Sequence, residues 1–318
     1  MLGYLGYLKL DDIFLLANSS GMNRVVNPII SQGVWGAGWY NSATVAYADS
    51  QQNFEGTVAF ELQAIPSVWN MIADWLVEQR VFAKSFSMSP NGVVEYFYNK
   101  VDNDPRSGAW CSQASFNIDA QSIVTVSATA IALIRQEVAN ASTYTDIRIG
   151  PGTPTGPLNP SPRNLNPIPG HNCYADITWP NAPPSWSTSN LNGFVMMNGS
   201  VNVNNNPQVI RGCTADPNPM AVLQGSMAVD GSITLWRNGQ LLDPYGPDNS
   251  HVGSFTASEA HINMYFGGLS GQQAFLVRHV LLTSDAFDIQ GMNSPTVRTF
   301  GFTGLGDGQY PPFQMTTT

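Results

Sequence analysis

Apolar and polar residues alternate with a period of two along much of the chain, a pattern typical of strands that bury one face. The alternation is clear over residues 56–62, and it recurs at residues 115–119 and 123–131. The hydrophobic pattern therefore predicts a mainly β fold.

Two segments add detail to this pattern. Residues 85–89 and 93–98 predict a hairpin, because the Pro-Asn-Gly sequence at 90–92 favours a turn. From Ser67 to Gln79 the apolar residues instead recur every three or four positions, which predicts one amphipathic helix that starts after Pro66. The apolar positions of this helix are Val68, Met71, Ile72, Trp75 and Leu76.

A proline-rich segment at residues 149–170 divides the chain nearly in half. It contains seven prolines, which are incompatible with a helix or an interior strand. We therefore expect an extended, semi-rigid linker between two domains, at residues 1–148 and 171–318.

The second half repeats the order of features in the first. Residues 116–126 align without a gap to residues 287–297, an offset of 171 (287 − 116), with four of eleven positions identical. Residues 56–60 correspond to residues 231–235 at an offset of 175 (231 − 56). The shared order and similar offsets predict an internal duplication. The helix has no good counterpart, because residues 237–248 contain two glycines and two prolines.

Charge is scarce in this sequence. Charged residues make up 11% of the chain against about 25% in typical globular proteins, while 43% of residues are hydrophobic. A surface with so little charge favours extensive burial against partners. The net charge of −9 and only 13 Lys and Arg residues argue against a nucleic-acid-binding surface.

The N-terminus and the cysteines indicate a cytosolic product. Residues 1–9 lack the basic region and uninterrupted apolar core of a signal peptide, and no apolar run approaches the ~18 residues of a membrane span. Cys111, Cys173 and Cys213 lack the paired spacing of a disulfide framework or zinc site. We expect three reduced thiols and no membrane binding.

No catalytic, cofactor-binding or metal-binding residue is predicted. The sequence Asp102-Asn103-Asp104 starts like a calcium loop but places Arg106 where an oxygen ligand belongs. The glycine-rich stretch at 304–308 is closed by prolines rather than followed by a helix. The histidines have no metal-ligand spacing and are expected at the surface or at a rim; they are His171, His251, His261 and His279. With no cofactor and no clustered catalytic groups, the chain is not expected to be an enzyme.

Two stretches of the second half carry a resemblance to a known family. One is the strand at 194–203 that ends in the Asn-rich turn 204–206, and the other runs from Pro217 through a small-residue turn into the Gly-Ser-Ile-Thr-Leu strand at 231–235. The first half is similar, with residues 14–20, the strand at 56–60, a helix and paired strands. The chain resembles the tail tube proteins of long-tailed bacteriophages.

That resemblance implies a fold and a function. The expected fold is two tandem β-sandwich or half-barrel domains of the tail-tube type, each with at most one flanking helix. The expected protein is a structural subunit of the virion tail, made and assembled in the host bacterial cytoplasm. Family members form stacked rings around a channel for DNA, so a two-domain chain implies a trimeric, pseudo-hexameric ring. Its partners would be further copies of itself and other tail proteins, namely the tape measure, terminator and distal tail proteins.

Two other functions remain open from the sequence. A distal tail or baseplate adaptor ring would use the same fold in fewer copies. A carbohydrate-binding β-sandwich would use the eight Trp residues as a sugar platform, although core and interface roles are commoner for such residues.

Overall fold

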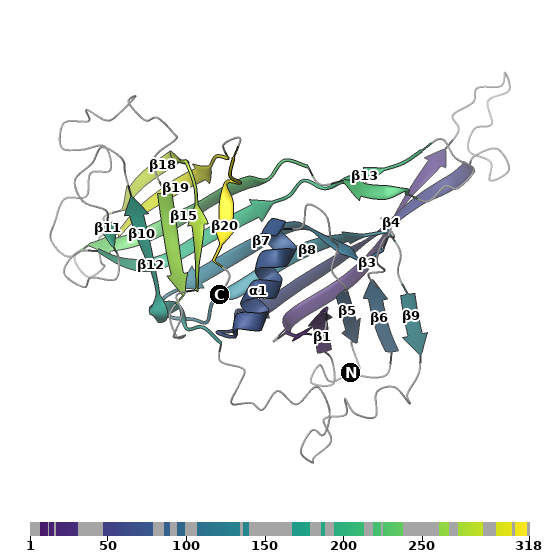
Figure 1. The fold of residues 1–318 in the computed structure, drawn as a ribbon, viewed down its shortest axis with the longest axis horizontal. Coiled ribbons are helices and arrows are strands. Elements are labelled where there is room, and N and C mark those ends of the chain that lie inside the picture. Colours follow the sequence, from purple (N-terminus) through teal and green to yellow (C-terminus); the bar gives the residue numbers. More distant parts are fainter. Residues whose placement is uncertain are drawn as a thin grey trace, which may run out of the picture.

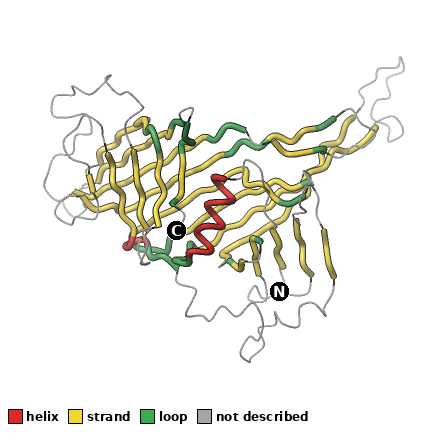
Figure 2. The backbone as a smooth tube through the Cα atoms, in the orientation of Figure 1, coloured by secondary structure: helices red, strands yellow, loops and turns green. Residues whose placement is uncertain are grey.

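Strands make up most of the regular structure of the protein; the described residues also include one α-helix, a π-helical segment that continues it and a short 3₁₀ helix at Gly170–Asn172 (Figure 2). The prediction of a mainly β fold is confirmed. The computed structural model describes residues 7–11, 13–15, 17–30, 47–78, 86–89, 94–98, 107–133, 136–139, 167–178, 186–187, 194–212, 219–223, 225–237, 261–266, 273–288, 297–306 and 309–316.

The largest element is an eight-stranded antiparallel sheet to which both halves of the chain contribute four strands (Figure 1). Its order is β18-β19-β15-β12-β7-β8-β4-β3, so β7 and β12 join the two halves at the centre. The strands of the first half are β3 (Ala17–Ile30), β4 (Tyr47–Glu61), β7 (Ala109–Asp119) and β8 (Thr125–Ala132). Those of the second half are β12 (Phe194–Asn204), β15 (Ala228–Arg237), β18 (Val280–Asp288) and β19 (Val297–Gly304).

Each half also has a five-stranded sheet of its own. In the first half the order is β2-β1-β5-β6-β9, with β1 (Tyr7–Leu10), β2 (Ile13–Phe14), β5 (Phe86–Ser89), β6 (Val94–Tyr98) and β9 (Gln136–Ala139). In the second half it is β11-β10-β16-β17-β20, with β10 (Cys173–Thr178), β11 (Trp186–Ser187), β16 (His261–Phe266), β17 (Gln273–Val277) and β20 (Phe313–Met315).

The predicted hairpin forms between β5 and β6, where Phe86 pairs with Tyr98 and Met88 with Tyr96. Its turn at 90–92 lies outside the described residues. A separate two-stranded ribbon, β13 (Gln208–Ile210) and β14 (Ala221–Leu223), lies between β12 and β15 in the sequence.

The predicted helix also forms, though its last turn differs from a regular α-helix. Helix α1 (Pro66–Ala73) has Pro66 in its first turn, and a π-helical segment (Asp74–Glu78) continues it. All five predicted apolar positions, from Val68 to Leu76, are buried. The second-half segment at 238–250, where a counterpart was predicted to have decayed, lies outside the described residues.

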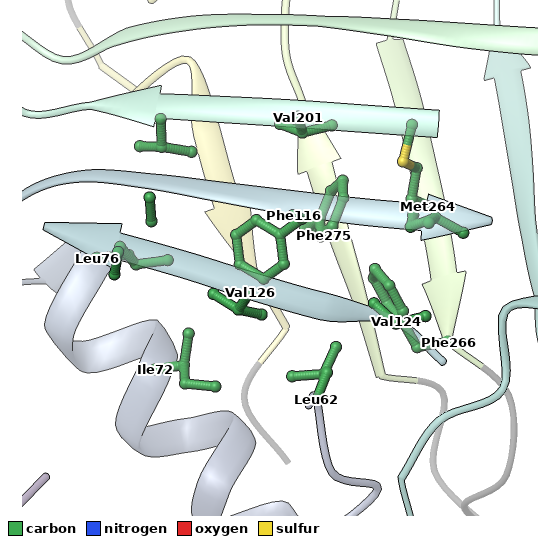
Figure 3. Close-up of a cluster of buried hydrophobic side chains, with 14 of the residues drawn as sticks. Leu62, Ile72, Leu76, Phe116, Val124, Val126, Val201, Met264, Phe266 and Phe275 are labelled. Atoms are coloured by element: carbon green, nitrogen blue, oxygen red, sulfur yellow. The ribbon is translucent and has the colours of Figure 1, made fainter. Parts of the chain in front are cut away.

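One hydrophobic core runs through both halves. It lies between the large sheet and the layer formed by α1 and the two smaller sheets. Figure 3 shows Ile72 of α1 and Leu76 of the π-helical segment directed toward Phe116 and Val126 of the large sheet, with Phe275 of the second half beside them. The halves therefore share their interior instead of folding around separate cores.

The two halves follow the same strand order in both kinds of sheet. Reading from β3 gives β3-β4-β8-β7, and reading from β12 gives β12-β15-β19-β18. Matching register irregularities accompany this order. A bulge at Ser112 of β7 corresponds to one at Thr283 of β18, an offset of 171 (283 − 112). A bulge at Asn18 of β3 corresponds to one at Met197 of β12, an offset of 179 (197 − 18).

The end of the proline-rich segment is packed into the first half. Ile168 is fully buried, and its N–H donates to the Leu62 carbonyl at 2.8 Å while its carbonyl accepts from Val124 N–H at 2.9 Å. Pro167 and Pro169 form isolated bridges to Gln63 and Ile123. The chain is therefore anchored there before β10 begins the second half.

Candidate functional site: a polar sheet face and two free edges

The large sheet has one apolar and one polar face, as alternation requires. Residues such as Phe116, Val126 and Ile233 point into the core. Many of their neighbours on the opposite face are small, polar and uncharged; the half-buried or exposed ones include Thr57, Ser115, Asn117, Thr125, Ser127, Thr129, Ser200, Asn202, Ser232, Thr234, Thr299 and Thr303. A shallow depression on this face is lined by Glu61, Asp119, Asn198, Ser200 and Ser232, among others.

Hydrogen bonds between strands use up much of the polar capacity of this face. Ser115 Oγ donates to Asn202 Oδ1 at 2.6 Å, and Asn202 Nδ2 donates to Asp230 Oδ2 at 2.9 Å, which links β7, β12 and β15. The hydroxyl pairs Ser200–Ser232 and Thr234–Thr299 lie at 3.0 and 2.9 Å. These side chains stabilise the sheet as cross-strand pairs and have fewer donors left for a ligand.

The charge on this face is negative. Its ionisable residues include Glu55, Glu61, Asp119 and Asp230. Among the described residues no lysine or arginine occupies a position on the polar face. The arginines of the large sheet occupy positions that the alternation assigns to its core side; they are Arg24, Arg237 and Arg298. A surface with carboxylates and no cations repels a polyanion such as DNA.

The joint between the two halves is a fully paired strand contact. Residues 113–119 of β7 pair antiparallel with residues 198–204 of β12. Ala114 and Val203 face each other on the core side, and both are fully buried. Ser115 and Asn202 are the neighbouring pair on the polar side.

Asn205 reinforces this joint where β12 ends. Its side chain is 2% exposed, and Nδ2 lies 3.1 Å from the Leu76 carbonyl oxygen and 3.3 Å from that of Cys111. Its backbone N–H donates to the Ser112 carbonyl at the β7 bulge, at 2.9 Å. This one residue therefore ties the second half to both the helical segment and the bulge of the first.

The large sheet ends in two strands with a free edge. Within the described residues β3 pairs with β4 and β18 pairs with β19, and neither has a partner on its other side. Exposed side chains follow both strands, including Ser19, Ser20 and Asn23 on β3 and Leu281, Thr283, Ser284 and Ala286 on β18. Unpaired backbone N–H and C=O groups at such edges are ready to pair with another strand.

The structure brings two of the four histidines together without making a metal site. The rings of His261 and His279 lie 5.7 Å apart, whereas His171 is exposed elsewhere and His251 lies outside the described residues. Burial, together with the neighbouring His279 and Arg278, lowers the pKa of His261. In the part of the chain that the structure describes, no three His, Cys, Asp or Glu side chains gather as a metal-binding group.

The remaining candidate residues have structural positions. Cys111 and Cys173 are free and buried, and burial raises the pKa of the Cys173 thiol to about 12 and that of Cys111 still further. Gly304 ends strand β19 and is followed by strand β20 rather than a helix. The segments with Asp102 and Cys213 lie outside the described residues.

The four tryptophans whose burial the structure describes give little support to a sugar platform. Trp69 and Trp75 are at most 1% exposed, and Trp110 and Trp236 are half-buried. Trp75 Nε1 donates to the Ala109 carbonyl at 3.2 Å, as expected of a core anchor. Sequence reasoning placed Asn205 in an Asn-rich turn without giving it a role, and it did not locate the two free edges, because strand order is not visible in periodicity.

Within the described residues, no helix is both long enough and apolar enough to cross a bilayer.

Comparison with known proteins identifies the family. The model of the phage tail tube protein family matches residues 44–236, more than half of the chain. A solved structure of the anti-feeding prophage baseplate is similar at 13% identity, covering 46% of this chain and 92% of that one, with a TM-score of 0.28. No curated protein matches. The chain belongs to the phage tail tube protein family and is a structural component of the virion tail.

Proposed function

We propose that three copies of this chain close a ring of six tail-tube-type domains, and that stacked rings form the tube through which DNA passes. In this proposal residues 1–148 and 171–318 are duplicated domains joined by the segment 149–170. The protein acts as a building block and has no enzymatic activity.

The central joint of the large sheet is the observation that carries the proposal. Two four-stranded units of the same order meet there, edge β7 against edge β12. The remaining edges, β3 and β18, occupy the places in their own units that β12 and β7 occupy in theirs. A contact that repeats the β7–β12 rotation between chains generates a closed ring, as any heterologous contact does when its rotation closes.

The polar face suits the wall of a DNA channel. In the closed ring the large sheets form a continuous barrel, whose polar faces line the bore and whose core faces are covered by α1 and the smaller sheets. The hydroxyl and amide groups of this face already form hydrogen bonds with one another, and its charged groups are scattered carboxylates. Passing DNA therefore finds no strong binding site.

The β13–β14 ribbon supports ring stacking. Met220, just before β14, and Leu223 on β14 are 47% and 55% exposed, which is unusual for large apolar side chains. We propose that the ribbon contacts the next ring, while other tail proteins, namely the tape measure, terminator and distal tail proteins, bind the channel and the ends of the tube.

Native mass spectrometry of single rings, combined with negative-stain microscopy, tests the proposal. Three chains per ring are expected, with six repeated lobes visible in projection. Six chains per ring would refute the trimer but leave a tube, and the absence of any ring or tube would refute the proposal. In purified virions the band of this chain should be among the most abundant; a few copies per particle would instead favour an adaptor ring.

A further inference from the structure

The charge on the two free edges carries a second proposal, which rests on the ring described above. It starts from the register of the central joint. There Ala114 on β7 stands opposite Val203 on β12, on the core side of the sheet, and both side chains are fully buried. The partner strands of a joint between chains can be placed in the same register, because the two halves correspond residue by residue.

Independent features of the two halves give the same residue correspondence. The bulges at Ser112 and Thr283 relate β7 to β18 by 171 residues. The pairings of β7 with β8 and of β18 with β19 then relate β8 to β19 by 172, and the next pairings relate β4 to β15 by 175, so that Gly56 matches Gly231. One further pairing relates β3 to β12 by 179, which is the offset that the separate bulges at Asn18 and Met197 give.

These offsets transfer the central joint onto the free edges. Ala114 becomes Asp285 (114 + 171), and Val203 becomes Arg24 (203 − 179). The same register places Ala286 opposite Asn23, in the positions of Ser115 and Asn202. The joint between chains would thus have residues of opposite charge where the joint within the chain has two apolar residues.

We propose that Arg24 of one chain and Asp285 of the next form an ion pair that selects head-to-tail contact between copies. Two free edges on each chain allow three pairings: β3 with β3, β18 with β18, and β3 with β18. An arginine and an aspartate on core-facing positions disfavour the first two through like charge or an unpaired charge near the core, and satisfy both residues only in the third. The same charges also oppose pairing of a free edge with β7 or β12 of a chain in which these two strands have not yet paired, because the facing residue there is apolar.

The register places one other cation of the same chain near Asp285. Arg298 of β19 stands diagonal to Asp285, on the same side of the sheet, with its guanidinium carbon 5.1 Å from the centre of the Phe300 ring. A variant at Arg298 therefore serves as the matched control, since it removes a cation from this face without touching the opposing edge.

Cross-linking reports the contact even when association is weak. Cysteines introduced as Asn23→Cys and Ala286→Cys, in a full-length chain that also carries Cys213→Ser, should be oxidised to disulfide-linked oligomers that end at three chains. Displacing one cysteine, as Asn23→Cys with Ser284→Cys, should lower the yield because the positions no longer face each other.

The charges are then reversed in this background. Arg24→Asp alone and Asp285→Arg alone should each reduce the cross-linked yield by about tenfold or more, since like charges opposed in an interface repel each other. The double reversal should restore it, and Arg298→Gln should not lower it. A mixture of the two single variants should give linked pairs but no closed trimer, because two kinds of chain cannot alternate around an odd ring. Circular dichroism and thermal unfolding verify that each variant folds.

The outcomes separate the two proposals. Single reversals that cross-link as well as the parent, or a double reversal that stays defective, would overturn the ion pair while rings seen by microscopy keep the proposed function. If neither rings nor cross-linked chains form at any concentration, the ring itself is wrong.

Discussion

At the scale of single residues, the molecule depends on a few polar groups buried at the meeting of its two halves. Asn205 is the clearest case, because its amide nitrogen lies within hydrogen-bonding distance of two buried carbonyls of the first half while its backbone binds the bulge of β7. Its counterpart by the 179-residue offset is Val26, which has no side-chain donor (205 − 179). The joint within the chain thus has an additional anchor that the proposed joint between chains lacks.

Replacing this side chain should destabilise the whole fold. In Asn205→Ala the carbonyls of Leu76 and Cys111 lose a donor in a buried site, so we expect a loss of about 2–3 kcal/mol in the free energy of unfolding. Urea denaturation followed by tryptophan fluorescence measures it. The control Gln208→Ala, at an exposed position of β13, should change stability by less than about 0.5 kcal/mol; equal effects for the two variants would contradict the role of Asn205.

The buried thiols should be chemically silent in the folded protein. Burial raises the pKa of both Cys111 and Cys173 well above the usual thiol value, so neither forms the reactive thiolate at pH 8. Alkylation at pH 8 followed by peptide mapping should label these two residues only after unfolding in denaturant. Rapid labelling of either one in the native protein would show that its site opens readily.

At the scale of elements, the sequence predicted the kinds of element better than their register. The strands at 56–62 and 115–119, the hairpin and the helix were all visible as periodicity, and each forms. The gapless match of residues 116–126 to 287–297 was right for Phe116 but wrong for Thr125. The pairings relate β8 to β19 by 172 residues, so Thr125 corresponds to Val297 instead of Thr296.

The reason is that a turn can gain one residue without leaving a signal in hydrophobicity. A shift of one residue exchanges the two faces of a strand, so such an error is large in structure although it is small in sequence. Bulges have the same effect: those at Ser112 and Thr283 are defined by pairing with a neighbour and by nothing in the local sequence. The free edges were likewise unpredictable, because they depend on the order of strands across the sheet.

Corresponding strands of the two halves carry core residues of different size, in keeping with the presence of helix α1 in the first half. Ala128 and Ala130 of β8 correspond to Phe300 and Phe302 of β19, by the offset of 172, and all four face the core. In the first half, buried helix residues such as Trp75 and Leu76 occupy interior volume beside small alanines. In the second half the phenylalanines supply that volume themselves.

Helix α1 couples the halves, so they should unfold together. Trp69 is fully buried, its Nε1 donates to the Thr316 carbonyl at 2.7 Å, and its ring lies 5.2 Å from that of Phe266 in the second half. Trp69→Ala should cost about 3–5 kcal/mol, and Trp69→Phe, which keeps a ring but loses the hydrogen bond, about 1–2 kcal/mol. Calorimetry should give one transition for the parent chain, whereas two separated transitions in the parent would refute the coupling.

At the scale of the whole molecule, the low charge of the large sheet and the arrangement of its faces and edges both fit the proposed tube. Within the described residues, the fold keeps one long face of its sheet polar, leaves two edges unpaired and shares one core between its halves. The arginines of the large sheet occupy positions on its core side, so the polar face carries neutral and acidic groups. In the proposed tube, a wall with this composition would surround DNA closely without holding it.

The affinity of this face for DNA should therefore be set by its charge alone. The parent protein should not retard duplex DNA in a gel at about 50 mM salt, because there is no cluster of cations to release counterions. A variant with Asn117→Arg, Ser200→Arg and Ser232→Arg places three cations around the depression of the polar face and should gain binding that weakens steeply with salt, with a log–log slope of roughly −2 to −3. The control Asn117→Gln, Ser200→Thr and Ser232→Thr should remain inert. Binding by the parent protein that is tight at low salt and lost at high salt would mean that cations gather elsewhere on the molecule, and the polar face would no longer be the surface that DNA meets.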